Sequence, residues 1–245
     1  MQMQFVKKLA MGGAITPLDM PDAIASTHTI SDGIVVKSKT SAGYPVSIDV
    51  YGDAWPYMFG YDWNSTRSGL NVTDVTFKNP NTAVGSCAFA GCTKLSSINN
   101  ENLVSLAINC FTNTALTNGF FPNVTSVTGG PPLRGVKTIT HLSFPKVQNC
   151  SIEGMFHSMQ NLQEIQLGSV GYGVTSVNYD IMFAATFNGT LTCYCKGSNV
   201  DNFLTNFRKY GGVNCTVVFK ASEETTYNGT TYQAGDTILT SEVTS

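Results

Sequence analysis

Apolar residues recur through the middle of the chain at nearly constant spacing. The first set is Phe89, Phe111, Leu133, Phe156 and Phe183, with gaps of 22, 22, 23 and 27 residues. A second apolar residue follows each of these about six positions later; this set is Leu95, Leu116, Ile139, Leu162 and Leu191. A shared period of about 20 to 50 residues is typical of a solenoid, in which each repeat forms one coil and covers the apolar edge of its neighbour. The pattern therefore predicts a solenoid with a continuous core and no natural pocket.

Each predicted coil contains one strand that starts near the second apolar residue. Its buried positions follow the spacing i, i+3, i+5, as in Ile139, Leu142 and Phe144. The positions between the buried ones point outward from the strand ladder; they are Asp74, Ser97, Asn118, His141, Glu164, Thr76, Asn99, Phe120, Ser143 and Gln166. The anchor segments, such as residues 87–92, are predicted to form a short helical or 3₁₀ turn on the opposite side of the coil.

The segment before the repeats predicts a different arrangement. Residues 33–39 and 45–51 alternate apolar and polar positions around a turn, which is typical of two half-buried strands. A run of aromatic residues follows; it comprises Trp55, Tyr57, Phe59, Tyr61 and Trp63. We favour an N-terminal cap over the open end of the core, because solenoids need such caps for solubility. An aromatic platform for sugar binding is the alternative.

The segment after the repeats predicts a helix and two further strand elements. Val200, Phe203, Leu204 and Phe207 share one helical face, and the glycines at 211 and 212 end that helix. A strand over residues 215–219 follows, and together they predict a C-terminal cap. Asn228-Gly229 suits a type I′ hairpin turn. The sequence thus predicts three parts. Residues 1–65 form an N-terminal arm and β cap for attachment, and residues 66–220 form the solenoid with its C-terminal cap. Residues 221–245 form a polar hairpin tail.

Composition narrows the classes of function. Charged residues make up 12%, about half the usual share, and the net charge is −2, so no basic face for nucleic acid is expected. No apolar run approaches the length of about 18 residues that a membrane span needs. At the N-terminus, the apolar stretch 9–15 after Lys7 and Lys8 is short and contains two glycines, which does not favour a cleaved signal peptide. An Asn-, Thr- and Ser-rich surface is typical of β-rich extracellular or virion proteins.

The seven cysteines are an odd number, which does not favour a disulfide framework. Cys92 and Cys110 occupy repeat slots that other coils fill with apolar residues, so we interpret them as small buried hydrophobic residues. Zinc binding by Cys193 and Cys195 is the alternative, but zinc knuckles usually have a wider gap and a second pair. We expect no metal and no cofactor.

Several segments resemble the BspA-like branch of the bacterial leucine-rich repeats. The residues concerned are the turn Cys87–Ile98, the strand Asn161–Leu167, the segment Phe144–Val147 and the end segment Tyr194–Tyr210. The resemblance covers roughly residues 70 to 220 and implies a mostly β leucine-rich-repeat solenoid, here with N- and C-terminal caps. The family implies adhesion and protein contact, with no catalytic residues. Its members occur on bacterial surfaces, in some parasites, and in bacteriophage tail and virion proteins.

No catalytic grouping is specific enough to predict an enzyme. The three histidines lie in unrelated contexts, and neither a G-x-S-x-G turn nor an H-E-x-x-H motif is present. Asp74 and Glu164 occupy equivalent strand positions about four coils apart, or about 19 Å at the usual strand spacing. Two carboxylates that cooperate in glycoside hydrolysis lie much closer together. A glycan depolymerase is the third-ranked function.

The outward side of the strand ladder is the predicted contact surface. The residues assigned to partner binding are Phe120, Asp74, Asn118, His141, Ser143, Glu164 and Gln166. Phe120 is the exception in a polar ladder, and an exposed Phe there marks a contact site. The alternative, which we favour, is that Gly119 shifts the register locally and buries Phe120.

These features predict a non-enzymatic structural or adhesion protein of a phage particle, on the tail, baseplate or head surface, and hence a virion location. The expected partners are other virion proteins through the N-terminal arm and a host surface glycan or protein through the solenoid. We expect no nucleic acid and no membrane as partners, and a homo-oligomer, since virion proteins are commonly symmetric. The alternative is a secreted bacterial cell-surface adhesin.

Overall fold

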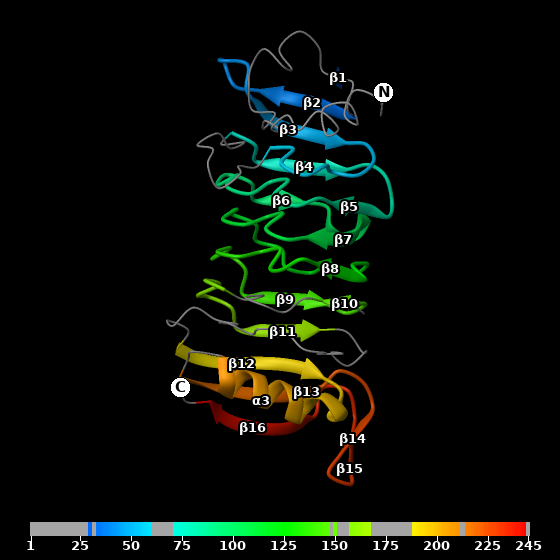
Figure 1. Cartoon of the computed structure of the whole chain (residues 1–245), viewed down its shortest axis with the longest axis vertical. Helices are drawn as coiled ribbons and strands as arrows, with labels where there is room; N and C mark the ends of the chain where they lie inside the picture. The colour runs from blue at the N-terminus through cyan, green and yellow to red at the C-terminus, as the bar shows by residue number, and fades with distance from the viewer. Residues whose placement is uncertain are drawn as a thin grey trace.

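A computed structural model describes residues 29–30, 33–59, 71–147, 149–150, 157–167, 188–210 and 214–243. The described residues form a stack of coils whose strands lie across the long axis of the molecule (Figure 1). The N-terminal strands lie at one end of this axis and the C-terminal strands at the other. The fold is mostly β with one α-helix among the described residues, α3 (Val200–Tyr210). The predicted fold class, a leucine-rich-repeat solenoid, is confirmed, while the capping role of its two ends stays a prediction.

One ladder of strands follows the predicted outward positions. Its N-terminal sheet has the order β1-β2-β3-β4-β6, and its C-terminal sheet has the order β16-β13-β12-β11-β9. The N-terminal strands are β1 (Thr29–Ile30), β2 (Ile34–Lys39), β3 (Pro45–Val50), β4 (Asp74–Phe77) and β6 (Ser97–Ile98). The C-terminal strands are β9 (His141–Phe144), β11 (Glu164–Leu167), β12 (Asn188–Cys195), β13 (Asn214–Ala221) and β16 (Thr237–Val243). Pairing is parallel from β3 to β6 and from β9 to β13, and antiparallel for β1, β2 and β16.

A second parallel sheet was not predicted. It has the order β10-β8-β7-β5, with β5 (Thr82–Val84), β7 (Leu103–Ala107), β8 (Ser126–Thr128) and β10 (Asn149–Cys150). The 3₁₀ turn η1 (Asn100–Asn102) leads directly into β7. The expectation of one strand per coil is therefore wrong, because these coils bend once and form two strands.

Phenylalanine side chains stack along the core. Phe89 lies between Phe59 and Phe111, with ring centroids 5.9 and 5.5 Å away, and Phe121 stacks on Phe144 at 4.9 Å. All five rings are fully buried. Removal of one such ring costs about 3–5 kcal/mol, because lost burial and a cavity add together. The anchors Phe89, Phe111 and Leu133 are confirmed as core, whereas Phe156 and Phe183 lie outside the described residues.

The anchor segments form successive hydrogen-bonded turns rather than a regular helix. Cys87 has a positive φ of 55°, and the amides of Ala90 and Cys92 donate to carbonyls three residues back, at 3.2 and 3.1 Å. Each turn also bonds to the next coil, since the Phe89 amide donates to the Cys110 carbonyl at 2.8 Å. These bonds satisfy backbone groups that the tight turns leave without a strand partner.

The C-terminal elements match the predicted types. The side chains of Val200, Phe203 and Leu204 are buried, as one helical face requires. The hairpin of β14 (Thr225–Tyr227) and β15 (Thr230–Tyr232) turns at Asn228 and Gly229, whose φ angles are 47° and 80°. Two positive φ angles define the predicted type I′ turn. Beyond the hairpin, β16 returns to pair with β13, so the predicted tail contributes a strand to the C-terminal sheet.

Candidate contact face

The outward positions form two columns along the strand ladder, in the predicted register. In the first column His141 lies beside Glu164, and at the N-terminal end Asp74 lies beside Ser97. In the second column, Phe120 forms an isolated bridge with Ser143. Ser143 lies beside Gln166, and Tyr194 of β12 lies on the other side of Gln166. We name the residues Asn118, Phe120, His141, Ser143, Glu164 and Gln166 the central face.

Phe120 is exposed, with 51% of its surface accessible. The favoured expectation, that Gly119 shifts the register and buries Phe120, is wrong. Gly119 is required for a different reason: a Cβ at this position would collide with the carbonyl oxygen of His141 on the next coil. The close approach keeps the ladder in register, because the Ser143 amide donates to the Gly119 carbonyl at 2.9 Å. Phe120 therefore points outward with its neighbours.

A buried asparagine beneath the central face holds the backbone of Phe120. The side-chain nitrogen of Asn100, which is 2% exposed, donates to the carbonyls of Asn118 and Phe120 at 3.2 and 2.8 Å. The Phe120 amide in turn donates to Oδ1 of Asn118 at 3.0 Å. This segment has no regular strand, so side-chain amides supply the hydrogen bonds that a ladder would supply elsewhere. Asn100 could not be found from the sequence, because one polar residue in a buried position has no periodic signal.

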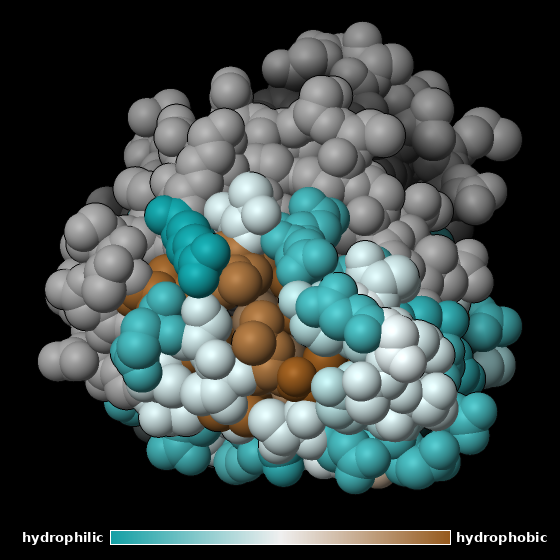
Figure 2. Space-filling model, turned by 90° about the horizontal axis from the view of Figure 1, so that it is seen from below, coloured by the Kyte–Doolittle hydropathy of each residue, from teal (hydrophilic) through white to brown (hydrophobic). Residues whose placement is uncertain are grey.

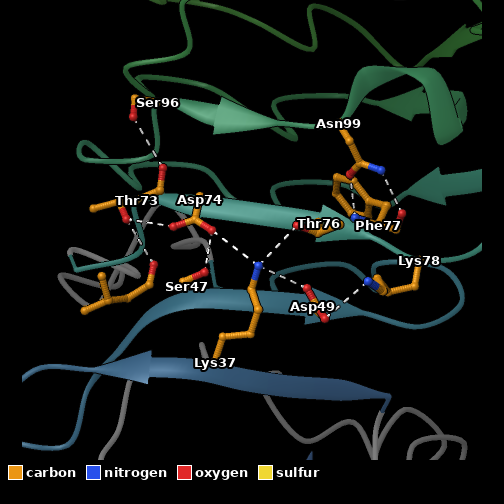
Figure 3. Close-up of polar contacts among 11 residues, drawn as sticks. Lys37, Ser47, Asp49, Thr73, Asp74, Thr76, Phe77, Lys78, Ser96 and Asn99 are labelled. Atoms are coloured by element: carbon orange, nitrogen blue, oxygen red, sulfur yellow. Dashed lines mark hydrogen bonds and ion pairs between the residues drawn. The ribbon is translucent and has the colours of Figure 1, made fainter.

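The neighbour of Phe120 on the preceding coil turns away from it. Figure 3 shows Asn99 hydrogen-bonded to the backbone of Phe77. Its Oδ1 accepts from the Phe77 amide at 2.6 Å, and its Nδ2 donates to the Phe77 carbonyl at 2.8 Å. Both ends of the Asn99 amide are therefore engaged with β4.

The remaining side chains of the central face pair with each other across adjacent strands. His141 Nε2 lies 3.4 Å from Glu164 Oε2, and the Ser143 hydroxyl donates to Gln166 Oε1 at 2.8 Å. The side chains of His141 and Glu164 are 62% and 40% exposed. The central face thus offers one apolar ring beside uncharged hydrogen-bonding groups and one exposed His141–Glu164 pair.

Asp74 does not belong to this group, although the sequence analysis assigned it to partner binding. It lies in what we name the N-terminal cluster: Lys37, Asp49, Asp74 and Lys78 (Figure 3). Lys37 Nζ is 3.3 Å from Asp49 Oδ1 and 3.7 Å from Asp74 Oδ1, and Lys78 Nζ is 3.5 Å from Asp49 Oδ2. Asp74 also accepts hydrogen bonds from the hydroxyls of Ser47 and Thr73. Whether any of the assigned residues binds a partner stays a prediction.

The cysteine side chains that the structure describes lie in the core. Cys92, Cys110, Cys193 and Cys195 are completely buried, which confirms the interpretation of Cys92 and Cys110 as small hydrophobic residues. Burial raises the pKa values of Cys110 and Cys193, and a buried thiol with a raised pKa is a poor nucleophile. Among the described residues, no group of three or more His, Cys, Asp or Glu side chains is arranged to hold a metal ion.

In the described part of the chain, no helix has the length and apolar character that a bilayer span needs.

The stacked coils, parallel ladder and buried turn anchors define a leucine-rich-repeat solenoid, a fold that typically serves as an interaction scaffold. Residues 65–185 match the family model of the BspA type leucine rich repeat region in six copies. This match supports the predicted resemblance of the repeat region to the BspA-like leucine-rich repeats. No curated protein and no solved structure matches the chain closely enough to indicate a relationship.

Proposed function

We propose that this chain is a non-enzymatic component of a phage particle, on the tail, baseplate or head surface. In this proposal the central face contacts a host glycan or protein. The single observation that carries the contact role is Phe120, a large apolar side chain that is 51% exposed in an otherwise polar ladder. Aromatic side chains dominate the energetics of many interfaces, because each ring buries a large area when a partner covers it.

Rigid presentation of the ring supports this role. The backbone of Phe120 is fixed by Asn100 from beneath and by Ser143 from the next coil. A backbone held in place before binding loses little conformational freedom when a partner covers the side chain, so more of the contact energy appears as affinity.

The particle assignment rests on the resemblance to a repeat family of which some members occur in phage tail and virion proteins, on the short array of six repeats and on the Asn-Gly hairpin. A secreted bacterial adhesin is compatible with the same solenoid. Mass spectrometry of purified particles and of secreted fractions from the source distinguishes the two. Peptides that contain Met1 or Gln2 in a particle support the virion assignment, whereas a mature chain that starts near residue 20 in the medium supports the adhesin.

The contact role is tested with the purified chain and fluorescently labelled cells of the host. We expect Phe120→Ala to weaken cell binding at least tenfold, which corresponds to about 1.4 kcal/mol, the range found for central contact residues. Thermal stability should change by less than about 0.5 kcal/mol, because the side chain is exposed.

Tyr51→Ala is the matched control. Tyr51 is the other exposed large hydrophobic residue of the described chain, 47% accessible, and it follows β3 in the N-terminal sheet. This variant should bind cells as the wild type does. Equal loss of binding in both variants, or a lower melting temperature of the Phe120 variant with unchanged binding, would contradict the contact role.

A further inference from the structure

The C-terminal sheet ends in a strand with one open edge. β16 pairs with β13 from Cys215↔Val243 to Lys220↔Thr237 and is the last strand in the sheet order. Among the described residues, no backbone hydrogen bond joins the other edge of β16 to a further segment. Such an edge presents a row of N–H and C=O groups that can pair with another extended chain.

The edge of β16 lacks the features that normally prevent pairing. The seven residues contain no proline and no lysine, and Glu242 is the only charged residue among them. The register irregularity between Phe219 and Lys220 falls at the Thr237 end and leaves the rest of the strand regular. By contrast, the edge strand at the other end, β1, has only two residues. Short strands, lysines, prolines and bulges are the usual protection, so β16 is the less protected edge.

Apolar residues also reach the surface at this end. Figure 2 looks onto the C-terminal end and shows an apolar strip bordered by polar residues. The described apolar residues that α3 and β16 contribute to the end of the core are Val200, Phe203, Leu204, Ile238, Leu239 and Val243, and all except Leu239 are buried. Leu239 is only partly buried against the core. A further strand along β16 would therefore satisfy backbone groups and could also cover the exposed part of Leu239.

We propose that β16 pairs with β16 of a second copy of this chain, antiparallel about a two-fold axis. The C-terminal sheets of two solenoids then form one continuous sheet. An antiparallel strand pair is self-complementary under two-fold symmetry, so one edge supplies both halves of the interface. In the register of full overlap, Thr240 lies opposite Thr240 of the second copy, and Glu242 lies opposite Ile238 of the second copy.

Charge and connectivity favour this register. The two copies of Glu242 do not oppose each other. Lys220 of the second copy lies on β13, opposite Thr237, which is next to Ile238. Two strand spacings, about 10 Å, therefore separate Glu242 from Lys220 of the second copy. The β14–β15 hairpin precedes β16 and lies at its Thr237 end (Figure 1). Antiparallel pairing places the two hairpins at opposite ends of the new strand pair, so they do not collide.

The test measures the molar mass of the purified full chain by size-exclusion chromatography with light scattering. The wild type should have twice the chain mass of 26.3 kDa. Thr240 is exposed at the centre of β16, so Thr240→Lys and Thr240→Glu should each fold normally and be monomeric, because like charges directly opposite each other destabilise a strand pair. An equimolar mixture of the two variants should restore the dimer, because the opposed charges then attract.

Thr93→Lys, which places the same charge on an exposed turn in an early coil, is the control and should remain dimeric. Hydrogen exchange identifies the interface: amides of β16 should exchange more slowly in the wild type than in the Thr240→Lys variant. A monomeric wild type, a dimeric Thr240→Lys variant, a mixture that stays monomeric, or unchanged exchange in β16 would each overturn the proposal.

Discussion

The N-terminal cluster and the central face occupy equivalent positions on one strand ladder, but their outward side chains have different tasks. In the N-terminal cluster, lysines and aspartates from different strands pair across the sheet (Figure 3). Asp49 is at the centre, with only 13% of its side chain exposed and a lysine on each carboxylate oxygen. The outward side chains here hold the sheet together.

The central face is held from inside instead. Asn100 bonds the carbonyls of Asn118 and Phe120 from beneath, and Gly119 allows the close approach of the next coil. The exposed side chains above them contribute little to this framework. The comparison indicates that a solenoid can leave its outward residues available for contact where buried polar groups fix the backbone.

The largest effect should come from the inner support of the central face. Asn100→Ala removes the donor from two partly buried backbone carbonyls and also removes Asn100 Oδ1, a buried acceptor without a partner among the described residues. A carbonyl left without a partner away from water costs about 1–3 kcal/mol. We expect a loss of about 2–3 kcal/mol in the free energy of unfolding, measured by urea denaturation. Asn123→Ala is the control, because its side chain donates to the Glu101 carbonyl from an exposed position and should cost less than about 1 kcal/mol. Equal losses of stability in the two variants would show that the buried Asn100 donor contributes no more than the exposed Asn123 donor.

A smaller effect is expected from the N-terminal cluster. Asp49→Ala leaves Lys37 and Lys78 without their shared carboxylate, and both lysines are about 40% exposed, so water replaces part of the interaction. We expect a loss of about 1–2 kcal/mol, between the values for exposed and buried ion pairs. Raising the salt concentration should reduce the difference between the variant and the wild type. A difference that does not change with salt would indicate a packing effect rather than an ion pair.

Periodic features of the molecule could be predicted from the sequence. Apolar residues repeat at fixed offsets, so the core positions, the two outward columns and the anchors Phe89, Phe111 and Leu133 follow directly. The helix with Val200, Phe203 and Leu204 on one face, and the Asn228-Gly229 turn, have strong local signals.

Features without a period could not be predicted. Phe59 stacks in the anchor column, but its distance of 30 residues from Phe89 is longer than the repeat. The second sheet consists of segments as short as Thr82–Val84, too brief for an alternating pattern. The exposure of Phe120 depends on the contact between Gly119 and His141, two residues that only the fold brings together.

The smallest effect on stability should come from the exposed side-chain pairs of the central face. A variant of such a pair most directly separates a role in partner binding from a role in stability. Glu164→Ala removes the partner of His141, but both side chains are largely exposed, and exposed ion pairs contribute less than about 1 kcal/mol. We expect a change below about 0.5 kcal/mol in the free energy of unfolding by urea denaturation, several times smaller than for Asp49→Ala. If the central face binds the host surface, this variant should nevertheless weaken binding of labelled host cells. A stability loss as large as that of Asp49→Ala would show that outward side chains hold both regions together, and the contrast between them would fail.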